Sequence, residues 1–155
     1  MAEVIEAAPS SEIYDAKTYN PKRSIGGLLG RVKMAMFEAL DAELEPLGIT
    51  AAQYAILMNL ANGVDSASGL CRSVSYDPGA MTRMIDRLER KGLVRRVPCS
   101  DDRRVMRLAL SEEGKAIYPQ LLERSVRVLN RRLRGFTEAD VHQLEALLER
   151  MLAND

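Results

Sequence analysis

The sequence predicts a mostly α-helical fold that carries one small β-hairpin. Three observations support this class: apolar residues recur at helical spacing in six segments, the spacing becomes strand-like only between residues 93 and 110, and capping residues precede several helical patterns. The length of 155 residues, with 46% apolar and 28% charged residues, fits one globular domain with extensions.

The first half of the chain is expected to contain an arm and three helices. Residues 1–23 show no sustained periodicity and are interpreted as an arm that is flexible unless a partner orders it. Residues 24–48 have the helical pattern of a long helix, which Pro46 and Gly48 end. Thr50 and Gln53 form a capping box at the start of a second helix, and residues 66–74 predict a short third one.

The strongest local signal begins at Asp77 and Pro78, an N-cap residue followed by a proline at the first helical position. The helix that follows has an apolar stripe and, opposite it, Thr82, Arg83, Arg87 and Arg90. Lys91 and Gly92 end it. Residues 93–97 and 105–110 then predict the hairpin, followed by helices over residues 111–133 and 137–152.

Composition excludes several classes of protein. No apolar run is long enough to span a membrane, and the start of the chain lacks the basic region of a secretory signal, so we expect a cytoplasmic protein. One histidine and two scattered cysteines do not form a metal site, and no arrangement of catalytic side chains or cofactor motif is visible. We therefore expect neither an enzyme nor a bound metal or cofactor.

The net charge of zero conceals a basic central region. Residues 72–107 contain ten basic and five acidic residues, whereas both flanking regions are acidic. A basic region confined to one part of a fold suggests a face that binds a polyanion. A merely solvated charged surface is the alternative.

A short helix, a turn, an arginine-bearing helix and a basic hairpin together predict a winged helix-turn-helix. In this motif the second helix enters the major groove of DNA and the hairpin reaches an adjacent groove or the phosphates. Thr82 and Arg83 are the candidates for base readout, while Arg87, Arg90, Arg95 and Arg96 are expected to meet phosphate or solvent. The predicted DNA-binding residues of the arginine-bearing helix are Pro78, Gly79, Thr82, Arg83, Arg87 and Arg90.

Three segments make the chain similar to the MarR (multiple antibiotic resistance regulator) family of winged-helix transcription factors. They are residues 70–83, residues 86–94, and the stretch from Asp102-Arg103-Arg104 to Leu108-Ala109-Leu110-Ser111-Glu112-Glu113-Gly114. The likeness covers residues 25–152. It implies that Arg104 enters the minor groove and that Asp102 holds its guanidinium. The resemblance thereby adds Asp102, Arg103 and Arg104 to the predicted DNA-binding residues.

The resemblance, with the surplus of apolar residues on the terminal helices, implies a homodimer on a palindromic operator. The predicted domains are the arm (1–23), a dimerisation helix (24–48), the winged helix-turn-helix (49–110) and C-terminal dimerisation helices (111–155). The resemblance also implies a repressor released by a small aromatic or phenolic anion. Arg31, Tyr54 and Met58 are the candidate effector residues, with a role in the interface or core as their alternative.

Two other functions remain open at this stage. The first is a winged-helix module that contacts an acidic protein partner through its basic face. The second is a redox-responsive regulator in which Cys99, in the wing and near several arginines, is oxidised. Cys99 is expected to be exposed, whereas Cys71 lies at an apolar helical position and is interpreted as a core residue.

Overall fold

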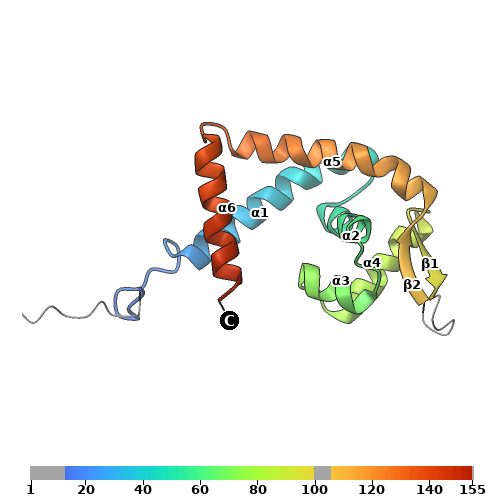
Figure 1. Ribbon diagram of the computed structural model, residues 1–155, viewed down its shortest axis with the longest axis horizontal. Coiled ribbons are helices and arrows are strands. Elements are labelled where there is room, and N and C mark those ends of the chain that lie inside the picture. The colour runs from blue at the N-terminus through green and yellow to red at the C-terminus, as the bar shows by residue number, and fades with distance from the viewer. Residues whose placement is uncertain (1–12, 100–105, 155) are drawn as a thin grey trace, which may run out of the picture. The chain divides into compact units, whose positions relative to one another are not determined.

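The computed structural model describes residues 13–99 and 106–154, and it confirms a mostly helical fold with a two-stranded antiparallel hairpin (Figure 1). The elements are, in order, α1 (Ile25–Leu44), η1 (Glu45–Leu47), α2 (Ala51–Ala61), α3 (Ala67–Val74), α4 (Pro78–Arg90), β1 (Val94–Pro98), β2 (Met106–Leu110), α5 (Glu112–Arg132) and α6 (Glu138–Leu152). Their contacts divide the chain into two compact units, one ending at Ala35 and one beginning at Met36.

In the first unit, side chains of the predicted arm contact the first turn of α1. The backbone N–H of Ile25 donates to the Tyr14 hydroxyl at 2.9 Å, and the Tyr19 hydroxyl donates to Ser24 Oγ at 3.0 Å. The two tyrosine rings meet edge to face with centroids 5.4 Å apart. Tyr14 and Ser24, whose Oγ accepts from the Gly27 N–H at 3.1 Å, thus satisfy backbone N–H groups at the start of α1 that have no partner within the helix.

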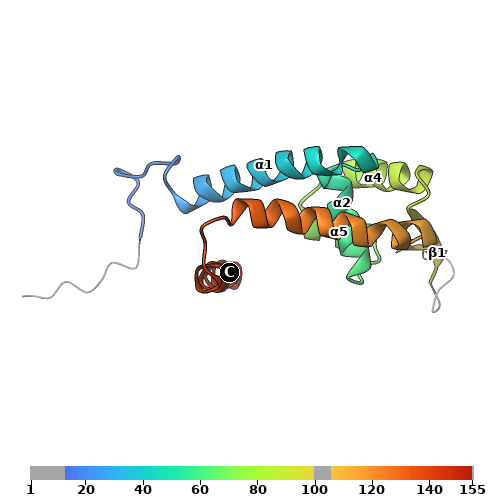
Figure 2. The same cartoon turned by 90° about the horizontal axis from the view of Figure 1, so that it is seen from above.

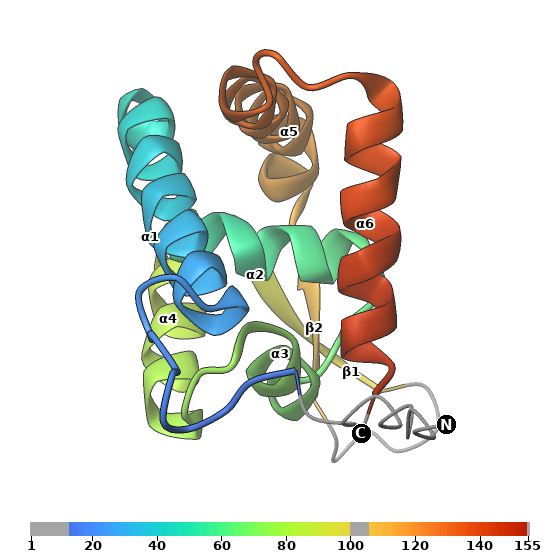
Figure 3. The ribbon, with the colours of Figure 1, turned by 90° about the vertical axis from the view of Figure 1, so that its left-hand side faces the viewer.

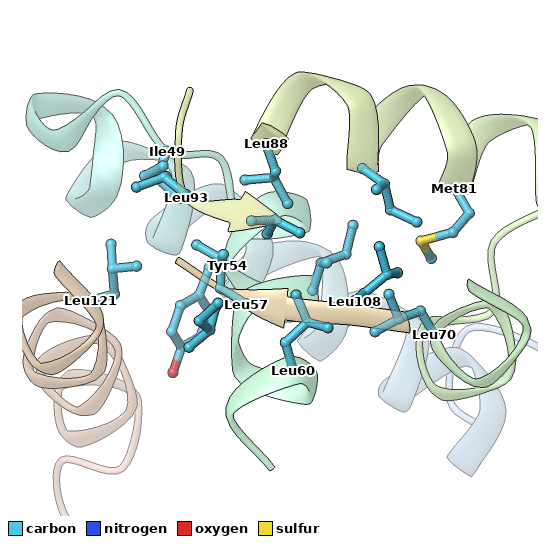
Figure 4. Close-up of a cluster of buried hydrophobic side chains, with 14 of the residues drawn as sticks. Ile49, Tyr54, Leu57, Leu60, Leu70, Met81, Leu88, Leu93, Leu108 and Leu121 are labelled. Carbon is cyan, nitrogen blue, oxygen red and sulfur yellow. The ribbon is translucent and has the colours of Figure 1, made fainter. Parts of the chain in front are cut away.

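The second unit contains the hydrophobic core (Figure 4). Side chains from α2, α3, α4, the hairpin and α5 meet there, and Leu44 joins them from the end of α1. The fully buried large side chains are Leu44, Ile56, Leu57, Leu70, Met81, Leu88 and Leu121. Such close packing makes the relative positions of these elements sensitive to single side chains.

The helix-turn-helix is built from local signals that the sequence carries. Ser66 Oγ accepts from the Gly69 N–H at 3.2 Å and caps α3, and Asp77 Oδ1 accepts from the Ala80 N–H at 2.9 Å and caps α4. Between the helices, Ser75 adopts a left-handed conformation with φ of 55°. Figure 3 shows α3 and α4 on the same side of α2.

Lys91, just past the end of α4, connects that helix to the start of α2. Its ammonium donates to the Gly48 carbonyl oxygen and, at 2.9 Å, to Gln53 Oε1. The same Gln53 oxygen accepts from the Thr50 N–H at 3.3 Å, which completes the predicted capping box. This small network holds the C-terminal end of α4 against α2.

The hairpin pairs Val94 with Leu110 and Pro98 with Met106. Strand β2 is also attached to the loop between α2 and α3, where the Leu108 N–H donates to the Asp65 carbonyl at 2.7 Å and Arg107 Nη1 donates to the Asp65 carboxylate at 2.7 and 2.8 Å. At the base of the hairpin, Gly114 lies so close to the Leu93 carbonyl oxygen that a Cβ on Gly114 would be 2.1 Å from it. Only glycine fits there without a shift of the backbone.

Helices α5 and α6 follow the hairpin (Figure 2). Helix α5 buries Gly114, Leu121 and Val128, whereas no residue of α6 is buried. The exposed large apolar side chains of this region are Leu122, Val126, Leu129, Phe136, Leu144, Leu147, Met151 and Leu152. Exposed apolar side chains in this number usually mark an interaction surface when they form one patch.

Candidate nucleic-acid interface

Helix α4 has one buried and one exposed face. Met81, Ile85 and Leu88 are buried in the core, while the opposite face exposes Thr82, Arg83, Arg87 and Arg90. The two sets alternate at helical spacing, so burial of the apolar stripe orients the arginines outward. The face predicted to bind DNA is therefore accessible, and four of its predicted residues project from a single helix.

The N-terminal end of α4 presents Pro78 and Gly79, both exposed. The Thr82 hydroxyl donates to the Pro78 carbonyl at 2.8 Å and retains lone pairs with which it can accept. A Cβ on Gly79 would lie 3.5 Å from Arg83 Nη1, so the Arg83 guanidinium lies over the first turn of the helix. The first turn of a helix also carries the positive end of the helix dipole, which favours phosphate.

Arg96, on β1, makes a contact that the sequence does not predict. It stays partly exposed, as an arginine expected to meet phosphate or solvent should, and its guanidinium pairs with Asp86 at 2.7 Å and with Glu89, both on α4. The hydrogen bond that Arg96 donates to Asp86 is the main cause that raises the pKa of Arg96. Arg96 thus joins the hairpin to α4, the helix expected to enter the major groove and called the recognition helix below.

The signal for this contact is present in the sequence. Asp86 and Glu89 are three residues apart, so they share one face of a helix, and Arg96 follows on the next element. Sequence alone does not show which strand residue faces them.

The tip of the wing lies outside the described residues, and with it the predicted residues Asp102, Arg103 and Arg104. The flanking strands are described, and at their open end Cys99 is half-buried rather than exposed as expected. Arg107 lies beside Cys99: the pKa of Arg107 is raised first by its hydrogen bond to Asp65 and also by its interaction with the Cys99 side chain. Cys71 is also half-buried and packs against the core, as its apolar position predicts.

The candidate effector residues do not share one unit. Tyr54 is buried in the core, and Met58, one turn further along α2, is half-buried against it. Figure 4 shows the Tyr54 ring at the edge of the cluster, with its hydroxyl pointing away from the neighbouring leucines. Burial, and to a smaller extent the neighbouring Tyr54, raise the pKa of Tyr118 on α5. Arg31 is exposed on α1 in the first unit.

Two further expectations concern metals and membranes. Among residues 13–99 and 106–154, no three His, Cys, Asp or Glu side chains are grouped in a way that could hold a metal ion. None of the helices in this part of the chain combines the length and apolar character needed to cross a bilayer.

The helix pair α3–α4, the hairpin beside it and the exposed arginine face define a winged helix-turn-helix DNA-binding protein. The model of the MarR family matches residues 47–105. The chain is 34% identical to the multiple antibiotic resistance protein MarR of Salmonella typhimurium, over 86% of this chain and 94% of that protein. The chain belongs to the MarR family, and it is a DNA-binding transcriptional regulator rather than an enzyme.

Solved structures agree with this assignment. A MarR variant from E. coli in complex with operator DNA is 35% identical, with a TM-score of 0.71 over 82% of this chain and 92% of that chain. CouR from Rhodococcus jostii, bound to p-coumaroyl-CoA, is 25% identical, with a TM-score of 0.77 over 89% of this chain and 98% of that one. The predicted family and fold are thereby confirmed.

Proposed function

We propose that the protein is a cytoplasmic homodimeric repressor that binds a palindromic operator and leaves it when a small aromatic anion binds. The observation that carries the DNA-binding part is the exposed polar face of α4 above a fully buried apolar stripe. A dimer seated on an operator excludes other proteins from the same DNA, and repression is the simplest consequence of that occupancy.

In this proposal some residues of α4 contact base edges and others contact phosphates. Thr82 and Arg83 lie near the N-terminal end of the helix, which meets base edges in this motif, and Arg83 can donate two hydrogen bonds to guanine O6 and N7. Arg87 and Arg90 lie further along the exposed face and are assigned to phosphates. Asp102, Arg103 and Arg104 keep their assignment to the wing, with Arg104 in the minor groove.

The exposed apolar side chains of α5 and α6 support the homodimer. Around the start of α6, Phe136, Leu144 and Leu147 line a hollow of about 400 Å³. A second copy of the chain would offer the same apolar side chains in return, as a two-fold interface requires. The dimer would place two recognition helices on half-sites about one helical turn, or roughly 10 base pairs, apart.

The effector part of the proposal draws on the relatives and on Tyr54, Met58 and Arg31. CouR is described with a bound aromatic acyl thioester, p-coumaroyl-CoA. Tyr54 and Met58 supply an aromatic and an adaptable side chain on one turn of α2, and Arg31 supplies an exposed cation. An effector can release DNA only if it binds the DNA-incompetent arrangement of the dimer more tightly.

The test begins with selection of bound sequences from random duplex DNA, followed by binding assays with single variants. Arg83→Ala should lose about 1–3 kcal/mol of binding free energy and relax the preference at one position in each half-site. Arg87→Ala should weaken all sequences alike and reduce the salt slope by about one unit per phosphate contact. If Arg83→Ala keeps full specificity, the reading surface is misassigned.

The effector is tested separately by titrating aromatic acids into the wild type and Arg31→Ala, with and without operator. Because coupling between sites is reciprocal, operator must weaken the effector by the factor by which the effector weakens operator. Equal binding of acids by both proteins would remove Arg31 from the site. If no acid changes the DNA affinity, the regulatory proposal fails and the DNA-binding one stands.

A further inference from the structure

A second group of charged side chains lies away from α4 and the hairpin, where the end of α1 runs beside α5 (Figure 2). The Glu43 carboxylate, on α1, lies within 4 Å of the guanidinium groups of three arginines of α5: Arg124, Arg127 and Arg131. The arginines follow one another at intervals of three and four residues, so they share one face of α5. We call these four residues the Glu43 cluster.

The three guanidiniums contact Glu43 unequally. Arg131 Nη2 donates to Glu43 Oε2 at 2.6 Å, and Arg124 Nη1 donates to the Glu43 backbone carbonyl at 2.9 Å. Arg127 Nε lies 3.8 Å from Glu43 Oε1, beyond hydrogen-bond distance. Arg127 therefore makes no hydrogen bond to Glu43, and its donors can meet another acceptor.

The charges of the cluster do not balance. Glu43 supplies one negative charge, and its pKa is lowered, chiefly by the hydrogen bond from Arg131. Arginine stays protonated at any physiological pH, so the cluster retains an excess of two positive charges. Among the described residues, Glu43 is the one carboxylate within 4 Å of these guanidiniums.

The excess charge is accessible to a ligand. The side chains of Arg127 and Arg131 are 54% and 50% exposed, whereas Glu43 is only 14% exposed. Like charges one turn apart on a helix repel each other, and an external anion would relieve that repulsion. Guanidinium groups match the oxygens of phosphate in geometry and form charge-assisted hydrogen bonds with them.

We propose that the Glu43 cluster binds a phosphate dianion, free or carried as a phosphomonoester, through Arg127 and Arg131. A phosphate monoester has close to two negative charges at neutral pH, which equals the excess in the cluster. Glu43 positions Arg131 by accepting its hydrogen bond, and Arg124 binds the Glu43 backbone carbonyl. This site shares no residue with the DNA-binding face or with the candidate effector residues.

The test is calorimetric titration of the full-length protein with inorganic phosphate and with glycerol 1-phosphate at constant ionic strength. The variants are Arg127→Gln, Glu43→Gln and the control Arg134→Gln, which removes an exposed arginine outside the cluster. Arg127→Gln should weaken phosphate at least about fivefold, since it removes one of the two charges that face the ligand. Arg134→Gln should bind like the wild type.

Glu43→Gln distinguishes a ligand site from a purely structural ion cluster. Removal of the carboxylate leaves three positive charges, so phosphate should bind about three- to tenfold more tightly, provided that thermal unfolding shows the variant to be folded. Equal affinity for the two ligands would indicate recognition of the phosphate alone, and tighter glycerol 1-phosphate would indicate an ester ligand. Phosphate affinity that is the same in the wild type and Arg127→Gln, or the absence of binding by the wild type, would overturn the proposal.

Discussion

The winged region and the C-terminal helices use apolar residues in opposite ways. From α2 to β2 the large apolar side chains are mostly buried, and Leu57, Leu70, Met81 and Leu88 are completely inaccessible to solvent. In α6, by contrast, no residue is buried, and Leu144, Leu147, Met151 and Leu152 are exposed. One region completes its own core, and the other leaves its apolar face uncovered within the chain.

The proposed function has two requirements, DNA readout and dimerisation, and each of the two regions meets one of them. A recognition helix must be held rigidly, because an arginine that reads a base edge needs a fixed position. The helices that join two copies must leave their apolar faces uncovered within one chain. The buried apolar stripe of α4 and the exposed apolar face of α6 therefore both serve the proposed function.

The largest effect is expected from charging the apolar face of α6. In the double variant Leu144→Asp and Leu147→Asp, the dimer dissociation constant should rise at least about a hundredfold, since burying an unpaired carboxylate costs several kcal/mol. Sedimentation measures the association state, and circular dichroism should show an unchanged helix content. A double variant that remains dimeric would place the interface elsewhere.

The second-largest effect is expected from truncation of a core side chain beneath α4. This effect concerns the stability of the single chain and not its association. Leu88→Ala removes a fully buried side chain and should lower the free energy of unfolding by about 2–5 kcal/mol in denaturant titrations. The matched change Leu152→Ala, at a residue 83% exposed, should cost less than about 0.5 kcal/mol in a monomeric background. Similar losses in both variants would contradict the division between the two regions.

A smaller effect is expected where the two regions join. Gly114→Ala introduces a Cβ against the Leu93 carbonyl oxygen, so the start of α5 must move away from the hairpin, at a cost of about 1–3 kcal/mol. Gly26→Ala, at a helical glycine with open space around it, is the control and should be neutral or slightly stabilising. Unfolding of both variants by urea measures the difference.

The smallest effect concerns pH. The pKa of Glu43 is lowered in the folded state, first by Arg131, so its contribution to stability is present above the ordinary pKa of a glutamate and is lost as the pH falls through the lowered value. Glu43→Gln should therefore reduce stability at neutral pH and make the acid side of the stability profile shallower. Parallel acid profiles for the wild type and the variant would exclude this contribution.

Much of the fold follows from short-range signals in the sequence. Asp77 and Pro78 set the start of α4, Thr50 and Gln53 form the capping box of α2, and Gly92 with φ of 72° follows the end of α4. Each of these signals acts within a few residues, so a single sequence is enough to interpret it. The exposed face of Thr82, Arg83, Arg87 and Arg90 follows from the same helical period.

The partners of charged residues were decided by the tertiary structure alone. Arg96 pairs with α4 while its side chain stays 38% exposed, Arg107 binds Asp65 across 42 residues, and Glu43 pairs with arginines more than 80 residues away. Charge and helical spacing indicate that such side chains are exposed, but not which element packs beside them. The sequence determined where the helices begin and end and which faces are apolar, because those depend on neighbours along the chain; only the packing of distant elements decided which guanidiniums are paired and which are left to bind a ligand.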